Sequence, residues 1–300
     1  MTVPADRLAA VDAKDRREPS ETMETASAIG GALAGTAMTL LAGPFVGSAS
    51  GEAVARVLLR VGFEVERRFF TPRQESRLGD AYAAAAQGIA AHLDASEEAR
   101  SDGFFEQPGP EQSSPADELL EGVLRTAADA WEQRKVPYLG RIFANLCFDT
   151  SVSPADASYL LRVADRLTYR QVTVLAFWQA VLDADRPYGH ELRGMFVVAH
   201  AEGWPQPTAT ILAEINDLAS LGLLGVRRKG DGEVVHPGMT IGGLEAFGTF
   251  GGVSITTIQP TDMGNTLHRL MGLDEVPDDD LNDVLAAMGG TSQRPAPEQR

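Results

Sequence analysis

Residues Ala26–Gly51 read ASAIGGALAGTAMTLLAGPFVGSASG, and no charged side chain lies between Glu24 and Glu52. Residues four apart lie on one face of an α-helix, and along this stretch every fourth residue is small. These residues are Ser27, Gly31, Gly35, Thr39, Gly43, Gly47 and Gly51. Such a face lets a second helix approach closely. The stretch therefore predicts a helix-packing or membrane surface centred on Gly31, Gly35, Gly43, Gly47 and Gly51.

Pro44 divides this stretch, because proline ends one helix and favours the first turn of the next. As one helix, the stretch would be about 39 Å long, which exceeds the roughly 30 Å hydrocarbon core of a bilayer. Its many Ala, Gly, Ser and Thr residues nevertheless favour insertion only weakly. Three interpretations stay open: a tightly packed helical hairpin, a self-association surface, and a membrane-active segment that a trigger releases.

Composition limits the class of protein. The 300 residues suffice for one large domain or two modest ones, and the net charge of -16 disfavours binding to polyanions. The single cysteine, Cys147, rules out an internal disulfide and lies in an apolar setting that predicts a buried, unreactive thiol. The first 25 residues are polar and give no secretory signal. We therefore expect a cytoplasmic protein with peripheral or conditional membrane association.

Helix caps and hydrophobic periodicity predict a mainly α fold. We expect a disordered arm (1–25), a Gly/Ala-rich helical hairpin (26–70), a helical bundle (71–166), a winged-helix-like α+β module (167–273) and an acidic disordered tail (274–300). Within the tail, one or two helical turns are expected from Leu281 to Met288. Thr71, Ser153 and Thr261 are the predicted N-cap residues of three helices. A helix predicted over 117–134 has the buried stripe Leu119, Leu120, Val123, Leu124, Ala127 and Trp131.

The order of elements after Leu167 is typical of a winged helix-turn-helix module. Helices are predicted at 167–182, 189–200, 207–221 and 261–273, with strands at 226–228, 233–235 and 253–258. The helix at 207–221 would read DNA, but it contains Glu214 and Asp217 and no Lys or Arg. Arg227, Arg228 and Lys229 on the wing are the candidate nucleic-acid contacts. The charges favour a protein partner over nucleic acid.

Signatures of catalysis and metal binding are missing from the sequence. It contains no Walker loop, no H-E-x-x-H and no C-x-x-C, and its five histidines show no ligand spacing. We therefore expect a protein that is not an enzyme, with no catalytic residue, no cofactor, no metal and no small-molecule substrate. The sequence RSDGFF (Arg100–Phe105) predicts a turn whose two phenylalanines dock into the bundle, with partner binding as the alternative.

Four features together resemble the bacterial abortive-infection alpha (Abi-alpha) type of phage-defence protein. They are the Gly/Ala-rich N-terminal region, the segment EVERRFF (Glu64–Phe70), a helix pair joined at WEQRKVPYL (Trp131–Leu139) and the C-terminal winged module. The resemblance covers most of residues 26–273. It implies a non-enzymatic role in growth arrest or cell death on infection, and it supplies no catalytic residue.

These observations lead to one functional hypothesis and two alternatives. The hypothesis is a defence-type effector or accessory protein that acts through protein–protein contacts or self-association, together with conditional membrane association of the small-residue stretch. The first alternative is a winged-helix transcription regulator that binds DNA, and the second is an enzyme of unrecognised type.

Overall fold

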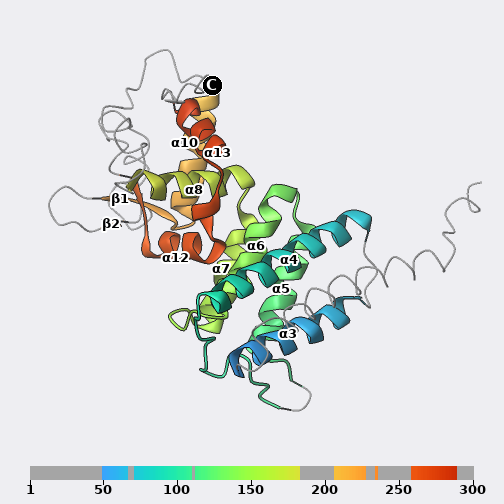
Figure 1. Ribbon diagram of the computed structural model, residues 1–300. Helices are drawn as coiled ribbons and strands as arrows, with labels where there is room; N and C mark the ends of the chain where they lie inside the picture. Colours follow the sequence, from blue (N-terminus) through green and yellow to red (C-terminus); the bar gives the residue numbers. More distant parts are fainter. Residues whose placement is uncertain are drawn as a thin grey trace, which may run out of the picture.

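The computed structural model describes residues 49–66, 71–109, 112–182, 206–227, 234–235 and 258–288. Over these ranges the chain is mainly helical, with a small antiparallel sheet. Helices α3–α7 form a bundle, and α8–α13 with the sheet form a second group beside it (Figure 1). None of the described helices is both long enough and apolar enough to cross a membrane.

The bundle consists of α3 (Ala49–Glu66), α4 (Pro72–Asp94), α5 (Pro115–Asp129), the short 3-10 helix η1 (Gln133–Lys135), α6 (Val136–Leu146) and α7 (Pro154–Arg166). The C-terminal group consists of α8 (Tyr169–Leu182), α10 (Gln206–Ser220), β1 (Leu224–Arg227), β2 (Val234–Val235), β3 (Ile258–Pro260), α12 (Asp262–Met271), η3 (Leu273–Glu275) and α13 (Asp278–Ala287). The expected helices at 167–182 and 207–221 correspond to α8 and α10. The expected helix at 189–200 lies outside the described residues.

Three bundle helices begin with the same local device. Thr71, Ser114 and Ser153 are N-cap residues, each followed by proline at the first helical position, and each side chain accepts a hydrogen bond from the backbone N–H three residues later. The hydroxyl satisfies an N–H that has no partner within the helix, and the proline has no N–H to satisfy. The caps predicted at Thr71, Ser153 and Thr261 are confirmed. The cap at Ser114 was missed.

The predicted helix over 117–134 is wrong at both ends. Helix α5 begins at Pro115 and ends at Asp129, because Ala130 has an extended backbone conformation. Trp131 therefore leaves the helical stripe, and its side chain is 94% exposed rather than buried. The other five members of the predicted stripe are buried in the core.

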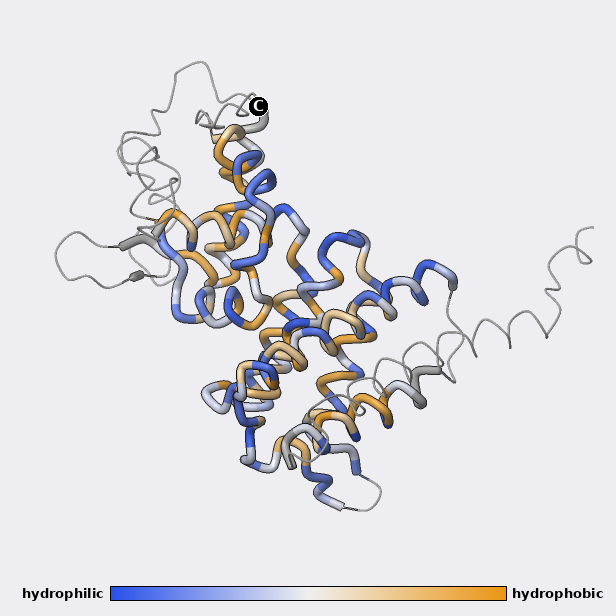
Figure 2. The backbone as a smooth tube through the Cα atoms, viewed as in Figure 1, coloured by the Kyte–Doolittle hydropathy of each residue, from blue (hydrophilic) through white to orange (hydrophobic). Residues whose placement is uncertain are grey.

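Helices α4 and α6 cross with their backbones almost in contact. A Cβ atom added to Gly140 of α6 would lie 2.1 Å from the carbonyl oxygen of Ala81, and one added to Gly88 of α4 would lie 2.7 Å from the Cβ atom of Ala144. The small residues of α4 thus produce the close packing that its Ala-rich sequence indicates. Hydrophobic residues concentrate where the bundle helices face one another (Figure 2).

Cationic side chains satisfy the carbonyl groups at several helix C-termini. The last carbonyls of a helix have no partner within it and form the negative end of the helix dipole, so a donated N–H from a cation stabilises them. Arg77 donates to the carbonyl of Ala128 at the end of α5, and Arg100 donates to the carbonyls of Asp149 and Val152 beyond α6. Lys135 donates to the carbonyls of Asp165 and Leu167 at the end of α7, and Arg141 donates to the carbonyl of Gly272 after α12. Arg100 and Lys135 are buried. The RSDGFF segment is therefore a structural corner, in which Phe104 is buried as expected.

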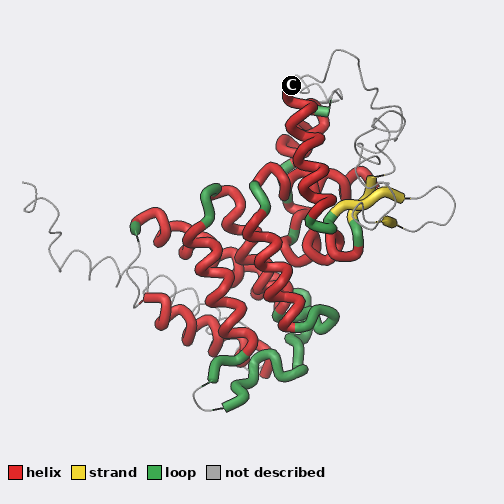
Figure 3. Tube along the Cα trace, turned by 180° about the vertical axis from the view of Figure 1, so that it is seen from behind, coloured by secondary structure: helices red, strands yellow, loops and turns green. Residues whose placement is uncertain are grey.

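The sheet lies at the outer edge of the C-terminal group, away from α3 and α5 (Figure 3). Its strand order is β2-β1-β3, with Val226 opposite Val235 and Leu224 opposite Pro260. The pairing of β1 with β2 is the predicted hairpin. The third strand, predicted at 253–258, is β3 at Ile258–Pro260, and residues 253–257 lie outside the described ranges.

The acidic tail expected from Asp274 is more ordered at its start than the one or two helical turns predicted at 281–288, because η3 and α13 occupy most of residues 273–287. Helix α13 follows Pro277, and its Leu281, Val284 and Leu285 side chains are buried. Val284 and Leu285 lie three and four residues after Leu281, so the three side chains share one helical face, and α13 packs against α8 and α10. The helical spacing of the apolar residues therefore decides that this segment folds and packs, despite its acidic composition.

Candidate interaction site

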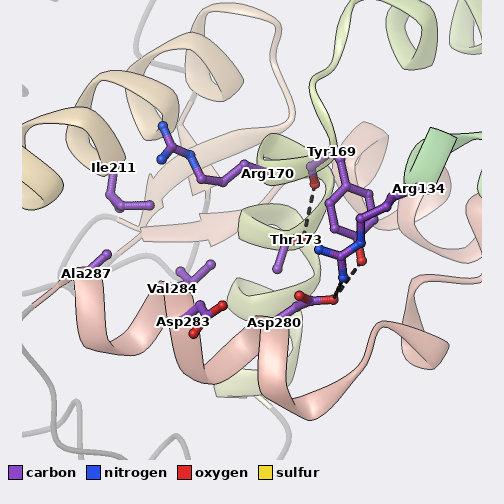
Figure 4. Close-up of a pocket in the computed structure, with 9 residues that line it drawn as sticks. All are labelled: Arg134, Tyr169, Arg170, Thr173, Ile211, Asp280, Asp283, Val284 and Ala287. Carbon is purple, nitrogen blue, oxygen red and sulfur yellow. Dashed lines mark hydrogen bonds and ion pairs between the residues drawn. The ribbon is translucent and has the colours of Figure 1, made fainter. Parts of the chain in front are cut away.

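A groove of about 300 Å³ lies between α8, α10 and α13. Its lining comes from four elements (Figure 4): Arg134, Tyr169, Arg170, Thr173, Ile211, Asp280, Asp283, Val284 and Ala287. Arg134, Tyr169 and Asp280 converge at one end, and the apolar Ile211 and Ala287 lie at the other. The groove therefore combines an apolar part with charged groups at its rim.

The elements that form the groove are fixed by local hydrogen bonds. Helix α8 begins with a reciprocal cap, in which the backbone N–H of Gln171 donates to the Thr168 hydroxyl (3.1 Å) and the N–H of Thr168 donates to the Gln171 side chain (2.9 Å). Helix α13 begins with three aspartates, Asp278–Asp280, where the positive end of the helix dipole favours carboxylates. Both helices thus present their first turns at the charged end of the groove.

Asp280 holds α13 to the bundle side of the groove. Its Oδ2 atom accepts a hydrogen bond from the Arg134 guanidinium and another from the Tyr169 hydroxyl at 2.8 Å. The guanidinium also lies 4.3 Å above the Tyr169 ring centroid, in cation–π contact. The hydrogen bond from Arg134 lowers the pKa of Asp280. Burial, followed by the bond to Asp280, raises the pKa of Tyr169, so this hydroxyl stays a donor.

A second ion pair joins α8 to α10. The Arg170 Nε atom lies 2.7 Å from Glu214 Oε1, whereas Glu214 Oε2 is buried and has no hydrogen-bond partner among the described residues. Burial raises the pKa of Glu214, and the bond from Arg170 acts against this increase. Asp283 is exposed and forms no ion pair within the described structure. The two arginines are thus each matched by an acid, and Asp283 leaves the groove with an excess of negative charge.

Trp131 lies three residues before Arg134, on the segment that leads from α5 to the groove. Its carbonyl oxygen accepts a hydrogen bond from Arg77 Nη2 at 3.3 Å, and the neighbouring Glu132 carboxylate accepts one from the backbone N–H of Tyr169 at 2.6 Å. The carbonyl of Trp131 and the side chain of Glu132 are therefore held, while the indole itself is 94% exposed. A large aromatic side chain presented in this way is typical of a protein-binding hot spot.

The residues predicted as sites have separate locations. Gly51 lies in the first turn of α3 and is partly exposed, whereas Gly31, Gly35, Gly43 and Gly47 lie outside the described residues. Arg227 is the last residue of β1 and is paired with Val234, and Arg228 and Lys229 lie outside the described residues. Gly51 and Arg227, the two that the structure describes, are not among the residues that line the groove.

Sequence reasoning missed the groove, although one signal for it was present. The segment PDDDLNDVL (Pro277–Leu285) combines a helix-starting proline, three first-turn aspartates and apolar residues at helical spacing. Together these predict a docked amphipathic helix. They do not identify α8 and α10 as its partners, because the contacts join residues more than a hundred positions apart, such as Tyr169 and Asp280.

Other chemical features of the described structure are limited. Among the residues in the ranges given above, no group of three or more His, Cys, Asp or Glu side chains could hold a metal ion. Cys147 is buried as expected, and burial raises the pKa of its thiol. No protein-family model, no curated protein and no solved structure matches this chain.

Proposed function

We propose that this protein is a non-enzymatic defence effector or accessory protein, of the kind that the Abi-alpha resemblance implies, and that it acts by binding another protein. The observation that carries the proposal is the exposed Trp131 indole, which lies three residues before Arg134 of the α8–α10–α13 groove. Hot spots of protein interfaces are enriched in tryptophan and arginine. Trp131 and the half-exposed Arg134 and Arg170 provide both residue types on neighbouring parts of the chain.

The C-terminal group supports a winged-helix module used for protein contact. Its order of helices followed by a β1–β2 hairpin and β3 is the order expected for such a module. In a DNA-binding version, α10 would enter the major groove. Here α10 contains no Lys or Arg, and the acidic helix α13 packs beside it. A negatively charged helix at this position would repel phosphates, which supports a protein partner over the transcription-regulator alternative.

The small-residue stretch adds a second component to the proposal, which is conditional membrane association. The observation in its favour is the uncharged sequence from Thr25 to Gly51. In cells challenged with phage, Gly35→Leu and Gly47→Leu should reduce both the membrane-bound fraction and protection. If the protein stays in the soluble fraction throughout and both variants protect like the wild type, this component is wrong.

Replacing the exposed indole tests the protein-binding proposal. We expect Trp131→Ala to fold normally, because the side chain buries almost no surface, and to reduce protection of phage-challenged cells by about tenfold or more, the loss typical of a hot spot. Plaque counts measure protection, and circular dichroism checks the fold. Tyr159→Ala is the matched control, because this aromatic residue is also exposed but lies on α7.

The outcomes separate the two functional classes. Full protection by the Trp131→Ala variant would contradict the protein-contact proposal. A loss of DNA retention at low salt on replacing Arg227, Arg228 and Lys229 together, with Trp131→Ala neutral, would instead support the transcription regulator.

A further inference from the structure

His92 lies where the C-terminal ends of three helices meet. It is in the last turn of α4, and its ring stacks on Phe148, just beyond α6, with centroids 4.5 Å apart and planes inclined by 20°. Its Nδ1 atom is 2.8 Å from Glu97 Oε2, and its Nε2 atom is 2.7 Å from Asn145 Oδ1. Asn145 in turn contacts the end of α12. Both ring nitrogens therefore face oxygen atoms.

The orientation of the Asn145 amide is set by α12. Its Nδ2 atom donates to the carbonyl oxygens of Arg269 (3.1 Å) and Leu270 (2.9 Å). Rotating the amide by 180° would place its oxygen against these two carbonyl oxygens, which offer no hydrogen to share. The Asn145 oxygen must therefore face His92, and because it can only accept, His92 Nε2 must carry a proton.

The same argument applies to the other ring nitrogen. An ionised Glu97 carboxylate only accepts hydrogen bonds, so the 2.8 Å contact requires a proton on His92 Nδ1 as well. A ring with both protons is the imidazolium cation. In the neutral ring one nitrogen has a bare lone pair, and retaining the two bonds to α12 leaves that lone pair on Nδ1, against the carboxylate. The Glu97 side chain is 51% exposed, so it can turn into water when this happens.

The surroundings also favour a positive charge at this position. The C-terminal end of a helix is its negative pole, and α4, α6 and α12 all end here. The charged and titratable side chains near these helix ends are Asp94, Glu97 and Glu98 around the end of α4, Arg141 and Asp149 on either side of the end of α6, His268 and Arg269 of α12, and Arg100. Arg141 is paired with Glu275. Asp149 is paired with Arg269, and Arg100 is paired with Asp102, so acids remain in excess.

We propose that protonation of His92 completes a hydrogen-bonded relay, Glu97–His92–Asn145, which ties the ends of α4 and α6 to the end of α12. The relay is complete while both ring nitrogens of His92 carry a proton. When the ring loses the Nδ1 proton, Glu97 is released and the end of α4 is held less firmly, whereas the bonds through Asn145 to α12 remain. This device is independent of the protein-binding proposal above.

The ring itself provides the first test. In 15N-histidine-labelled protein at about pH 5.5, two-dimensional NMR should show both nitrogens of His92 protonated, with the signal assigned by its loss in His92→Gln. At about pH 8 the spectrum should show the neutral tautomer with hydrogen on Nε2. A neutral His92 at the lower pH, or a neutral tautomer with hydrogen on Nδ1 at the higher pH, would overturn the relay.

Amide hydrogen exchange provides the second test through Glu97→Gln, a change at an exposed side chain that should leave the fold intact. The amides of Ala95 and Ser96, which donate to Ala91 and Leu93, report on the end of α4. In the variant at about pH 5.5 they should exchange roughly two- to fivefold faster than in the wild type, as expected for a partly exposed ion pair. At about pH 8 the ratio should approach one.

Glu98→Gln is the matched control, because it removes the same charge from the next exposed position. If Glu98→Gln accelerates exchange as much as Glu97→Gln, the effect is general electrostatics and the relay is wrong. A Glu97→Gln ratio that does not change with pH would contradict it equally.

Discussion

The interior of the bundle and the groove beside it use cationic side chains in opposite ways. In the bundle, Arg100 and Lys135 are buried and donate to carbonyl groups at helix ends. At the groove, Arg134 and Arg170 are 61% and 50% exposed, although each is paired with an acid. The buried cations stabilise the fold and cannot contact a partner, whereas the groove arginines can. Under the protein-binding proposal, the bundle is therefore the scaffold and the groove is the contact surface.

The bundle and the C-terminal group each contain a helical glycine that packs directly against a backbone carbonyl. A Cβ atom on Gly140 would lie 2.1 Å from Ala81 O, and one on Gly264 would lie 2.1 Å from Leu223 O. Neither carbonyl can move without shifting its helix or strand. This shared feature allows the stability of each region to be reduced separately.

The largest effect is expected for Gly140→Ala, which should lower the free energy of unfolding by about 2–4 kcal/mol because α4 and α6 must separate. Urea denaturation followed by circular dichroism measures it. Gly79→Ala, where an added Cβ meets nothing within 4 Å, is the control and should be neutral or slightly stabilising.

Gly264→Ala should instead loosen the C-terminal group, and faster amide hydrogen exchange in α12 would measure this. Equal loss of bundle protection in both glycine variants would show that the two regions unfold as one.

The next effect is expected for Lys135→Met, which retains the apolar part of the side chain but removes its donors. The carbonyl groups of Ala164, Asp165 and Leu167 then lose their shared partner, which should lower the free energy of unfolding by about 2–3 kcal/mol. Arg125→Met, at an exposed ion pair on α5, should change it by less than about 0.5 kcal/mol. Comparable losses in the two variants would show that the buried lysine contributes no more than a surface charge.

The smallest effect is expected at the groove, for Asp280→Asn. Because the folded protein lowers the pKa of Asp280, the ionised carboxylate contributes stability above its unfolded pKa of about 4, and this contribution is lost as the pH falls through the lower, folded pKa. At neutral pH the variant should be less stable by at most about 1 kcal/mol, since Arg134 is largely exposed. The difference should vanish in acid. Denaturation midpoints between about pH 2 and 7 test this, and a constant difference would be the contrary result.

Local signals in the sequence predicted most helices, because their causes are local. Thr71, Ser153 and Thr261 cap helices through residues three positions away. The prediction was wrong for Trp131, because this residue continues the helical spacing of apolar residues although the helix ends at Asp129 and Ala130 is extended. The Ser114–Pro115 cap was a readable signal for the true start of that helix.

Contacts between distant residues could not be predicted in this way. Lys135 and Leu167 are 32 positions apart, and Arg134 and Asp280 are 146 positions apart. Nothing in the spacing of these residues distinguishes a cation that will be buried at a helix end from one that will lie beside a groove. The groove and the His92 relay both depend on such contacts, so they required the three-dimensional structure.

The buried cations Arg100 and Lys135 also bear on the long-range electrostatic interactions of the protein. The formal net charge is -16, but this sum counts Arg100 and Lys135, which are screened from solvent within the fold. Among the described residues, two cations but only one acid, Asp117, are buried in this way, so the charges that a partner meets at the surface are slightly more negative in sum than the formal charge indicates. A basic partner would be attracted before contact, and its association would be faster in low salt than in high salt, whereas nucleic acids and anionic surfaces would be repelled during the same approach.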